Sequence, residues 1–350
     1  MRLGLSLGYQ TAWTTAADHL ALAREAERLG FSVVWAAEAY GSDSPSMLAW
    51  LAGQTSRIDL GAAVMQIPAR TPTSTAMTAA TIDTLSGGRF RLGLGVSGPQ
   101  VSEGWHGVRF NSPLGRTREY VDIVRMALAR ERVSYSGTHY TLPLPDGPGK
   151  ALKLGFHPPR ADIPIYLAAI GPKNLRLAGE VADGWLAIFF APEHASSQLA
   201  EIRAGREVTG RDLTGFDVVP SVPVVVGEDP SACAELVRWY AALYVGGMGS
   251  REQNFYNRLA VRMGYEQAAR QVQDLYLAGR HRDAAAAVPA EFIDRTSLLG
   301  SRERIADRLV AYAESGVTTL SVSLFAADAE SGAATLRTMA EAAELAGVGD

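Results

Sequence analysis

Short apolar runs and amphipathic stretches alternate along almost the whole chain of 350 residues, and this alternation restricts the fold more than any other feature. The apolar runs have the length of buried strands, and the amphipathic stretches have the period of helices with one buried face. Strand–helix alternation indicates a parallel sheet, and eight such units close most naturally into a (β/α)8 barrel. The eight expected strands lie near residues 2–8, 32–37, 58–66, 90–96, 163–169, 184–190, 216–226 and 317–325. Helices are expected near residues 16–29, 45–56, 73–86, 114–130, 172–182, 193–209, 229–244, 301–314 and 331–346.

Two stretches exceed a plain barrel, and we expect both to be lids or insertions in one domain that spans residues 1–350. Residues 131–162, after the fourth strand, are rich in proline and glycine, which predicts a long loop with fixed turns over the active face. Residues 246–300, between the seventh and eighth strands, are expected to be mostly helical. For this second segment a lid, a dimer contact and a decorative insertion all remain open.

Composition restricts the binding partners and the cellular compartment that we expect. The formal net charge of -4 disfavours a nucleic-acid partner, which usually requires a strongly basic face. The single cysteine, Cys233, excludes an internal disulfide and fits a reducing cytosol. The six histidines have no zinc-binding spacing, so no metal is expected. No signal peptide precedes the apolar run at 3–7 and no apolar run could span a bilayer, so we expect a cytoplasmic protein without a membrane partner.

Residues 93–98 spell Gly-Leu-Gly-Val-Ser-Gly, the G-x-G-x-x-G pattern of dinucleotide-binding Rossmann folds. In that fold the motif lies in an early strand–helix unit and opens a helix at once. Here three expected strands precede it, and the next expected helix begins only near Pro113. We therefore favour the barrel, and interpret the small residues as positions where the backbone approaches a flat or anionic ligand closely.

Seven segments, taken together, resemble the bacterial luciferase-like superfamily, and they are most similar to its coenzyme F420-dependent oxidoreductase branch of actinobacterial type. The resemblance covers residues 1–190 well and the last strand loosely. It implies a (β/α)8 barrel, a homodimer, and a cofactor that lies across the carboxyl-terminal mouth of the barrel. The segments are 2–5, 34–41, 60–72, 85–90, 92–98, 163–172 and 182–185.

The same resemblance places the F420 ring against the third strand and its phosphate near the loop after the fifth. It implies a cis peptide bond between Ala63 and Val64 behind the ring, although the residues alone fit an ordinary buried strand. Gln66 offers the donor and the acceptor that the pyrimidine edge requires, while Ser97 and Gly98 are expected to line the ring or its ribityl chain. The phosphate is expected at the glycine turn that opens the next helix, which consists of Ile170, Gly171, Pro172, Lys173 and Asn174.

Four residues are candidates for catalysis. Glu38 follows the second strand, where barrel sites recruit catalytic groups, but relatives often carry an acid–histidine pair there and this chain has Ala39 in place of the histidine. Glu38 can therefore hold the cofactor or a water, or form an ordinary ion pair. Tyr40 is a candidate proton donor or a packed loop aromatic. Glu103 and His106 follow the fourth strand, and His106 is either an acid–base group or a structural histidine.

The function that these features predict is hydride transfer between F420 and an unidentified organic small molecule. The protein would supply orientation, a dry pocket and one proton donor or acceptor. One alternative is an FMN-dependent monooxygenase that receives reduced flavin from a separate flavin reductase. A second is a non-catalytic barrel that binds a flavin, a deazaflavin or a fatty ligand, and a third is an unrelated barrel enzyme that acts on a sugar phosphate.

Overall fold

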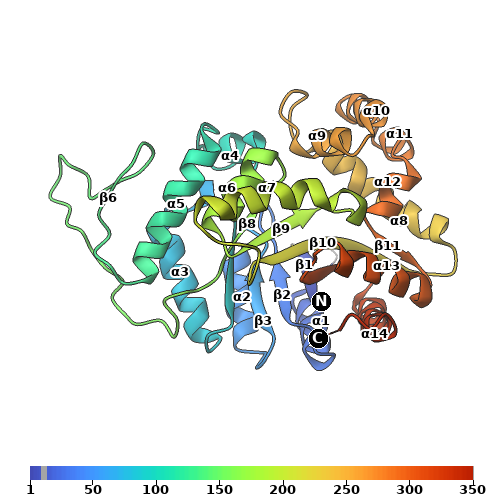
Figure 1. Ribbon diagram of the computed structural model, residues 1–350, viewed down its shortest axis with the longest axis horizontal. Coiled ribbons are helices and arrows are strands. Elements are labelled where there is room, and N and C mark those ends of the chain that lie inside the picture. The colour runs from blue at the N-terminus through green and yellow to red at the C-terminus, as the bar shows by residue number, and fades with distance from the viewer. Residues whose placement is uncertain (9–13, 350) are drawn as a thin grey trace.

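Eight parallel strand positions close into a barrel within residues 1–8 and 14–349, the part of the chain that the computed structural model describes (Figure 1). The third position consists of two short pieces, β3 and β4. Strand β10 pairs with both β9 and β12, and β12 pairs with β1, so the ring of strands closes. The barrel strands are β1 (Arg2–Gly8), β2 (Val33–Ala36), β3 (Asp59–Ala62), β4 (Met65–Gln66), β5 (Phe90–Gly95), β8 (Ile165–Ala168), β9 (Gly184–Ile188), β10 (Asp217–Val226) and β12 (Thr319–Leu324).

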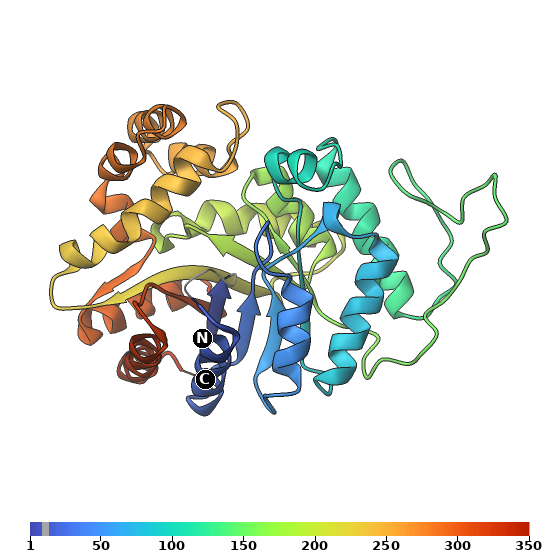
Figure 2. The same cartoon turned by 180° about the vertical axis from the view of Figure 1, so that it is seen from behind.

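Helices cover the outside of the barrel (Figures 1 and 2). Their starts follow the cap chemistry of the sequence: Thr15 and Asp18 form a capping box before α1, and Asp328 and Ser331 form another before α14. Proline stands in the first turn of several of the others, where a missing N–H does no harm. The covering helices are α1 (Ala16–Arg28), α2 (Ser44–Ala52), α3 (Pro72–Leu85), α5 (Pro113–Leu128), α6 (Pro172–Val181), α7 (Ala195–Val208), α8 (Pro230–Ala242), α13 (Arg302–Glu314) and α14 (Ala329–Leu345).

The expected (β/α)8 barrel is confirmed, and the differences lie in short elements. The expected strand 58–66 is interrupted between β3 and β4. A six-residue helix, α4 (Pro99–Gly104), stands where a loop was expected. The three-residue strand β11 (Leu298–Gly300) pairs with β10 inside the stretch expected to be helical. A strand of three residues and a helix of six are too short to show their own period, so β11 and α4 could not be recognised.

The interior of the barrel is filled at the amino ends of its strands. Arg91 donates hydrogen bonds to Asp59 at 2.9 Å and to Asp217 at 3.1 Å, which closes that end with a buried ion-pair network. Further along, the rings of Trp35 and Tyr166 pack edge to face with centroids 5.3 Å apart. The carboxyl ends of the strands therefore remain as the end of the barrel that can carry a site.

The segment 131–162 lies outside α5 and projects away from the barrel, not across its mouth (Figures 1 and 2). The expected position over the active face is therefore wrong. The reason is topological: the segment leaves from the carboxyl end of α5, which lies at the opposite end of the barrel from the mouth. Its hairpin, β6 (Tyr135–Ser136) and β7 (Thr141–Leu142), is held by the Glu119 carboxylate, which accepts the backbone N–H groups of 138–140 at 2.8–2.9 Å.

The segment 246–300 is mostly helical, as expected, and it packs against α8 and its π-helical extension η3 (Leu243–Gly247). Its aromatic core includes Phe189, which follows β9 and lies 5.5 Å from Phe292, ring centre to ring centre. The helices of this insertion stand at the same end of the molecule as α4 (Figures 1 and 2). They are α9 (Phe255–Arg262), α10 (Glu266–Leu277), α11 (His281–Ala286) and α12 (Ala290–Arg295).

Candidate active site

The ends of β3 and β5 pack too closely at the mouth to admit side chains. A Cβ atom on Gly93 would lie 1.8 Å from the Ala62 carbonyl oxygen, and one on Gly95 would lie 2.5 Å from Val64 Cγ2. Gly93 and Gly95 are therefore needed for strand packing, which accounts for the first two glycines of the G-x-G-x-x-G pattern without a Rossmann fold. The Ala63–Val64 peptide bond between β3 and β4 is cis, as the resemblance implied.

Glu38, just after β2, is held on both carboxylate oxygens, and only 8% of its side chain is exposed. Oε1 accepts hydrogen bonds from Arg70 Nη1 at 2.6 Å and from the Gln66 backbone at 3.4 Å. Oε2 accepts one from the Ser44 backbone at 3.3 Å. Arg70 also pairs with Asp43. Glu38 thus fixes the loops that follow β2 and β4 relative to each other, which corresponds to the ion-pair alternative for this residue.

Gln66, at the end of β4, links three strand ends through its side-chain amide. Its Nε2 donates to the Ala39 carbonyl at 2.6 Å, and its Oε1 accepts from Ser97 Oγ at 2.5 Å. Ser97 adopts a φ of 58°, a left-handed conformation that turns the chain at the end of β5. Gln66 is buried, and these two bonds fix the orientation of its amide at the mouth.

The other catalytic candidates lie at the rim, Glu103 on α4 and Tyr40 and His106 outside the helices. Tyr40 is 61% exposed. Glu103 accepts a hydrogen bond from the Phe110 backbone at 3.0 Å and lies 3.9 Å from Arg109, so it closes its own loop. His106 Nε2 is buried, and it has no hydrogen-bond partner among the described residues. The structure thus brings Glu38, Gln66 and Ser97 into one hydrogen-bonded set, but it does not join Glu103 or His106 to that set.

The turn after β8 has the features of a phosphate site. Gly171 caps α6, and no side chain accepts from the first turn of the helix. The Asn174 and Leu175 N–H groups donate to the Gly171 carbonyl at 2.9 Å, which shapes the turn. Lys173 forms no ion pair within the described residues. Because β8 neighbours β5 in the barrel, this turn stands beside the strand end that carries Ser97.

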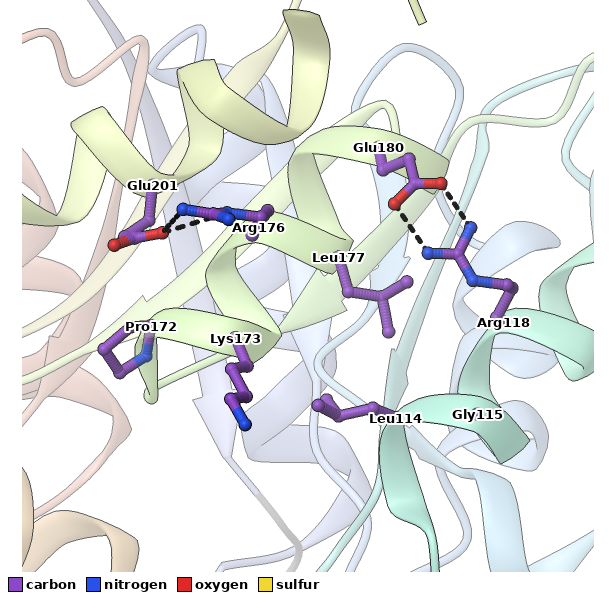
Figure 3. A pocket seen from close by; sticks show the side chains of 9 residues that line it. All are labelled: Leu114, Gly115, Arg118, Pro172, Lys173, Arg176, Leu177, Glu180 and Glu201. Atoms are coloured by element: carbon purple, nitrogen blue, oxygen red, sulfur yellow. Dashed lines mark hydrogen bonds and ion pairs between the residues drawn. The ribbon is translucent and has the colours of Figure 1, made fainter. Parts of the chain in front are cut away.

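A cavity of about 410 Å³ lies between the starts of α5 and α6 (Figure 3). Two of its arginines are paired: Arg118 with Glu180 at 2.5 Å and Arg176 with Glu201 at 3.0 Å. Lys173 extends into the cavity from the start of α6, as Figure 3 shows, and is its remaining lining cation among the described residues. The cavity therefore continues outward from the candidate phosphate turn.

The insertion 246–300 reaches the rim of the mouth through α9. The Phe255 ring lies 6.2 Å, centre to centre, from Phe110 in the loop after β5. Arg262 Nη2 donates to the Ile170 carbonyl at 3.0 Å, directly before the phosphate turn. The insertion thus contacts the loops that follow two neighbouring barrel strands.

Sequence reasoning gave no role to three residues at the mouth: Arg70, Arg262 and Tyr276. The position of Arg70, just after the third strand, was a usable signal, because barrel sites recruit residues there. Burial raises the pKa of Tyr276, and the neighbouring Tyr40 raises it further, so α10 lies beside the loop after β2. Arg262 and Tyr276 belong to the insertion 246–300, and no general rule predicts from sequence how such an insertion packs on a barrel.

The described residues also bear on metal binding and on membrane-spanning helices. No three or more histidine, cysteine, aspartate or glutamate side chains gather there in a way that could hold a metal ion. No helix in the described ranges is long and apolar enough to cross a membrane.

Family comparison defines the class of the protein. The luciferase-like monooxygenase family model matches residues 1–319. The chain therefore belongs to the luciferase-like family, as the seven sequence segments suggested.

Individual relatives narrow the comparison within that family. The chain is 45% identical to a protein of Mycobacterium tuberculosis that is named as a coenzyme F420-dependent oxidoreductase, over 94% of this chain and 96% of that protein. It is 31% identical to the 5,10-methylenetetrahydromethanopterin reductase of Archaeoglobus fulgidus, over 84% and 85% of the two chains. Among solved structures, the F420-dependent tetrahydromethanopterin reductase of Methanopyrus kandleri superposes with a TM-score of 0.81 at 25% identity, covering 96% of this chain and 97% of that one.

Proposed function

We propose that the protein is a coenzyme F420-dependent oxidoreductase that transfers a hydride between F420 and an organic small molecule. The observation that carries the proposal is the mouth itself: Gln66 joins the ends of β2, β4 and β5, and the glycine turn of α6 stands next to them. Such a mouth suits a flat ring with a phosphorylated tail. Identity of 45% over nearly the full length of a relative named as F420-dependent favours F420 over FMN.

The residues at the turn fit the phosphate. A Cβ atom added to Gly171 would meet no heavy atom within 4 Å, so the turn is open on that side. The backbone N–H of Lys173, the positive end of the α6 dipole and the Lys173 ammonium suit an anion. Gly171, Lys173 and Asn174 would bind the phosphate, with Ile170 and Pro172 shaping the turn.

Ala63 and Val64, between β3 and β4, and Ser97 and Gly98, after β5, would line the ring. F420 supplies a ring carbon that gains or loses a hydride and reacts poorly with oxygen. The chain's part is to hold the ring and the substrate in register and to exclude water. Gln66 and Glu38 act as positioning residues, because both side chains are buried and hydrogen-bonded within the protein.

Proton transfer at the rim requires a side chain outside the hydrogen-bonded set of Glu38, Gln66 and Ser97. Tyr40 is exposed beside the mouth, and the His106 ring carries a buried nitrogen without a partner among the described residues. We assign Tyr40 and His106 as the candidate proton donors. Glu103 would act through its loop, because its carboxylate accepts the Phe110 N–H.

Separate titrations of the purified protein with F420 and with FMN, followed by absorbance and fluorescence, test the proposal. We expect saturable F420 binding and no FMN binding. Lys173→Gln should weaken F420 binding about fivefold, as expected for loss of one charge-assisted contact worth about 1 kcal/mol. Lys153→Gln, which removes an exposed lysine of the outer insertion, is the matched control. FMN binding without F420 binding would instead indicate an FMN-dependent monooxygenase served by a flavin reductase.

We also propose that the protein is a cytoplasmic homodimer. The free thiol of Cys233 supports a reducing compartment. Exposed apolar side chains on neighbouring helices support a second subunit: Met77 and Leu85 of α3 are 59% and 56% exposed, and Trp50 of α2 is 37% exposed. Covering them in a dimer would remove this apolar surface from water.

A further inference from the structure

Helix α9 carries two arginines one turn apart, Arg258 and Arg262, and neither has a carboxylate partner within the described residues. Arg262 Nη2 donates to the Ile170 carbonyl at 3.0 Å, and Arg258 Nη2 donates to the Glu252 carbonyl. Both acceptors are neutral backbone oxygens. The two positive charges on this face of α9 therefore lack a compensating negative charge.

Arg258 and Arg262 are exposed, and their surroundings differ from those of two half-buried arginines, Arg70 and Arg308. Burial lowers the pKa of Arg262, and the charge of Arg258 lowers it further. Burial acts to lower the pKa values of Arg70 and Arg308, but hydrogen bonds and charges of carboxylates outweigh it and raise them. A pair of like charges one helical turn apart is unfavourable. An anion between the two guanidinium groups would relieve this repulsion.

The pair stands at the rim of the mouth. Ile170, which accepts from Arg262, directly precedes Gly171 of the candidate phosphate turn. At the other end of α9, Phe255 packs near Phe110 in the loop after β5. The arginines therefore lie at the same end of the barrel as the proposed cofactor. They stand on α9, which contacts the residue before the phosphate turn but is not part of that turn.

We propose that Arg258 and Arg262 bind a carboxylate or phosphate group of a molecule held at the barrel mouth. The proposal rests on the function given above and narrows the substrate to an anionic organic compound. The planar guanidinium fork matches such oxyanions with paired hydrogen bonds. The anionic tail of F420 is a second source of the same chemistry, so the experiment separates the two sources.

The test compares three proteins: the wild type, the double variant Arg258→Gln/Arg262→Gln, and a control, Arg270→Gln/Arg280→Gln. The control removes two exposed arginines of the same insertion, which pair with Glu266 and Asp283, and changes the net charge equally. The probes are F420, its deazaflavin chromophore without the phosphorylated tail, and inorganic pyrophosphate added to F420-saturated protein. Arg258→Gln alone, at an exposed position, serves as a second variant if the double variant does not fold.

Two outcomes support the site. If pyrophosphate binding to the loaded protein weakens about tenfold or more in the double variant while F420 binding is unchanged, the oxyanion belongs to the substrate. If F420 binding weakens to that extent while binding of the tailless chromophore does not, the oxyanion belongs to the cofactor. Equal affinities of the double variant and the control for all three probes would overturn the proposal. Failure of the wild type to bind F420 or its chromophore, with pyrophosphate binding still lost in the double variant, would overturn the proposed function but not the anion site.

Discussion

At the scale of single residues, the mouth is built from polar groups that satisfy one another. Glu38, Arg70, Gln66 and Ser97 belong to three different strand ends, and their hydrogen bonds fix those ends together. A buried carboxylate is costly unless it is paired, so Arg70 is the partner on which Glu38 depends. The shape of the mouth thus depends on residues that need not touch a ligand.

Replacing Arg70 should destabilise the protein and also weaken cofactor binding. In Arg70→Gln the Glu38 carboxylate, 8% exposed, would retain only two long backbone hydrogen bonds, at 3.3 and 3.4 Å. We expect a loss of about 2–3 kcal/mol in the free energy of unfolding, measured by urea denaturation. The control Arg251→Gln breaks an exposed pair with Asp274 and should cost less than about 1 kcal/mol. Equal losses in the two variants would show that the Glu38–Arg70 pair has no special role.

At the scale of elements, the first and last helices of the barrel are tied by one carboxylate. Glu25 of α1 accepts hydrogen bonds from Arg28 on the same helix and from Arg337 on α14 at 2.8 Å. The hydrogen bond from Arg28 is the main cause that lowers the pKa of Glu25, from 4.5 to about 2, and Arg337 contributes. The ionised carboxylate therefore links the two ends of the chain.

This link should depend on pH. Because the pKa of Glu25 is lowered in the folded state, its contribution to stability is complete above pH 4.5 and is lost as the pH falls towards 2. Glu25→Gln should therefore lower the thermal unfolding midpoint relative to wild type at pH 7, and the difference should shrink between pH 4.5 and 2. A difference of constant size across that range would contradict the assignment.

The elements also show where sequence reasoning succeeded. The covering helices were predictable because each is long enough to show its period and some begin with caps such as the Thr15–Asp18 box. The barrel strands were predictable because they are apolar runs that alternate with those helices. The strand β11 was not, since its three residues are a strand only through pairing with β10. Helix α4 was not predicted either, because its six residues are too few to show a helical period.

At the scale of the whole molecule, the barrel places segments that are distant in sequence at one end. The predicted site residues at the ends of β4 and β5 and at the start of α6 do lie on neighbouring strands, because strand order in a closed parallel barrel follows chain order. The position of 131–162 could not be found from its composition, since proline and glycine content says nothing about which end of the barrel a loop leaves from. Chain order could have shown it, because the segment follows a helix and not a strand.

The outer contacts of the insertion 246–300 were beyond sequence reasoning for a different reason. Arg262 meets Ile170 across 92 positions of the chain, and that contact depends on how α9 docks on the barrel. Likewise, Gln66 has the donor and acceptor expected of a ligand contact, but in the structure its Nε2 donates to the Ala39 carbonyl and its Oε1 accepts from Ser97 Oγ. A side chain's chemistry was predictable in such cases, whereas its partner was not.

The most direct measurement is a crystal structure of the protein with F420 bound. We predict that the ring lies against Ala63 and Val64, beside Ser97, and that the phosphate contacts the turn formed by Gly171 and Lys173. A ring bound elsewhere on the molecule, or a phosphate away from the start of α6, would contradict the assignment of the barrel mouth as the cofactor site.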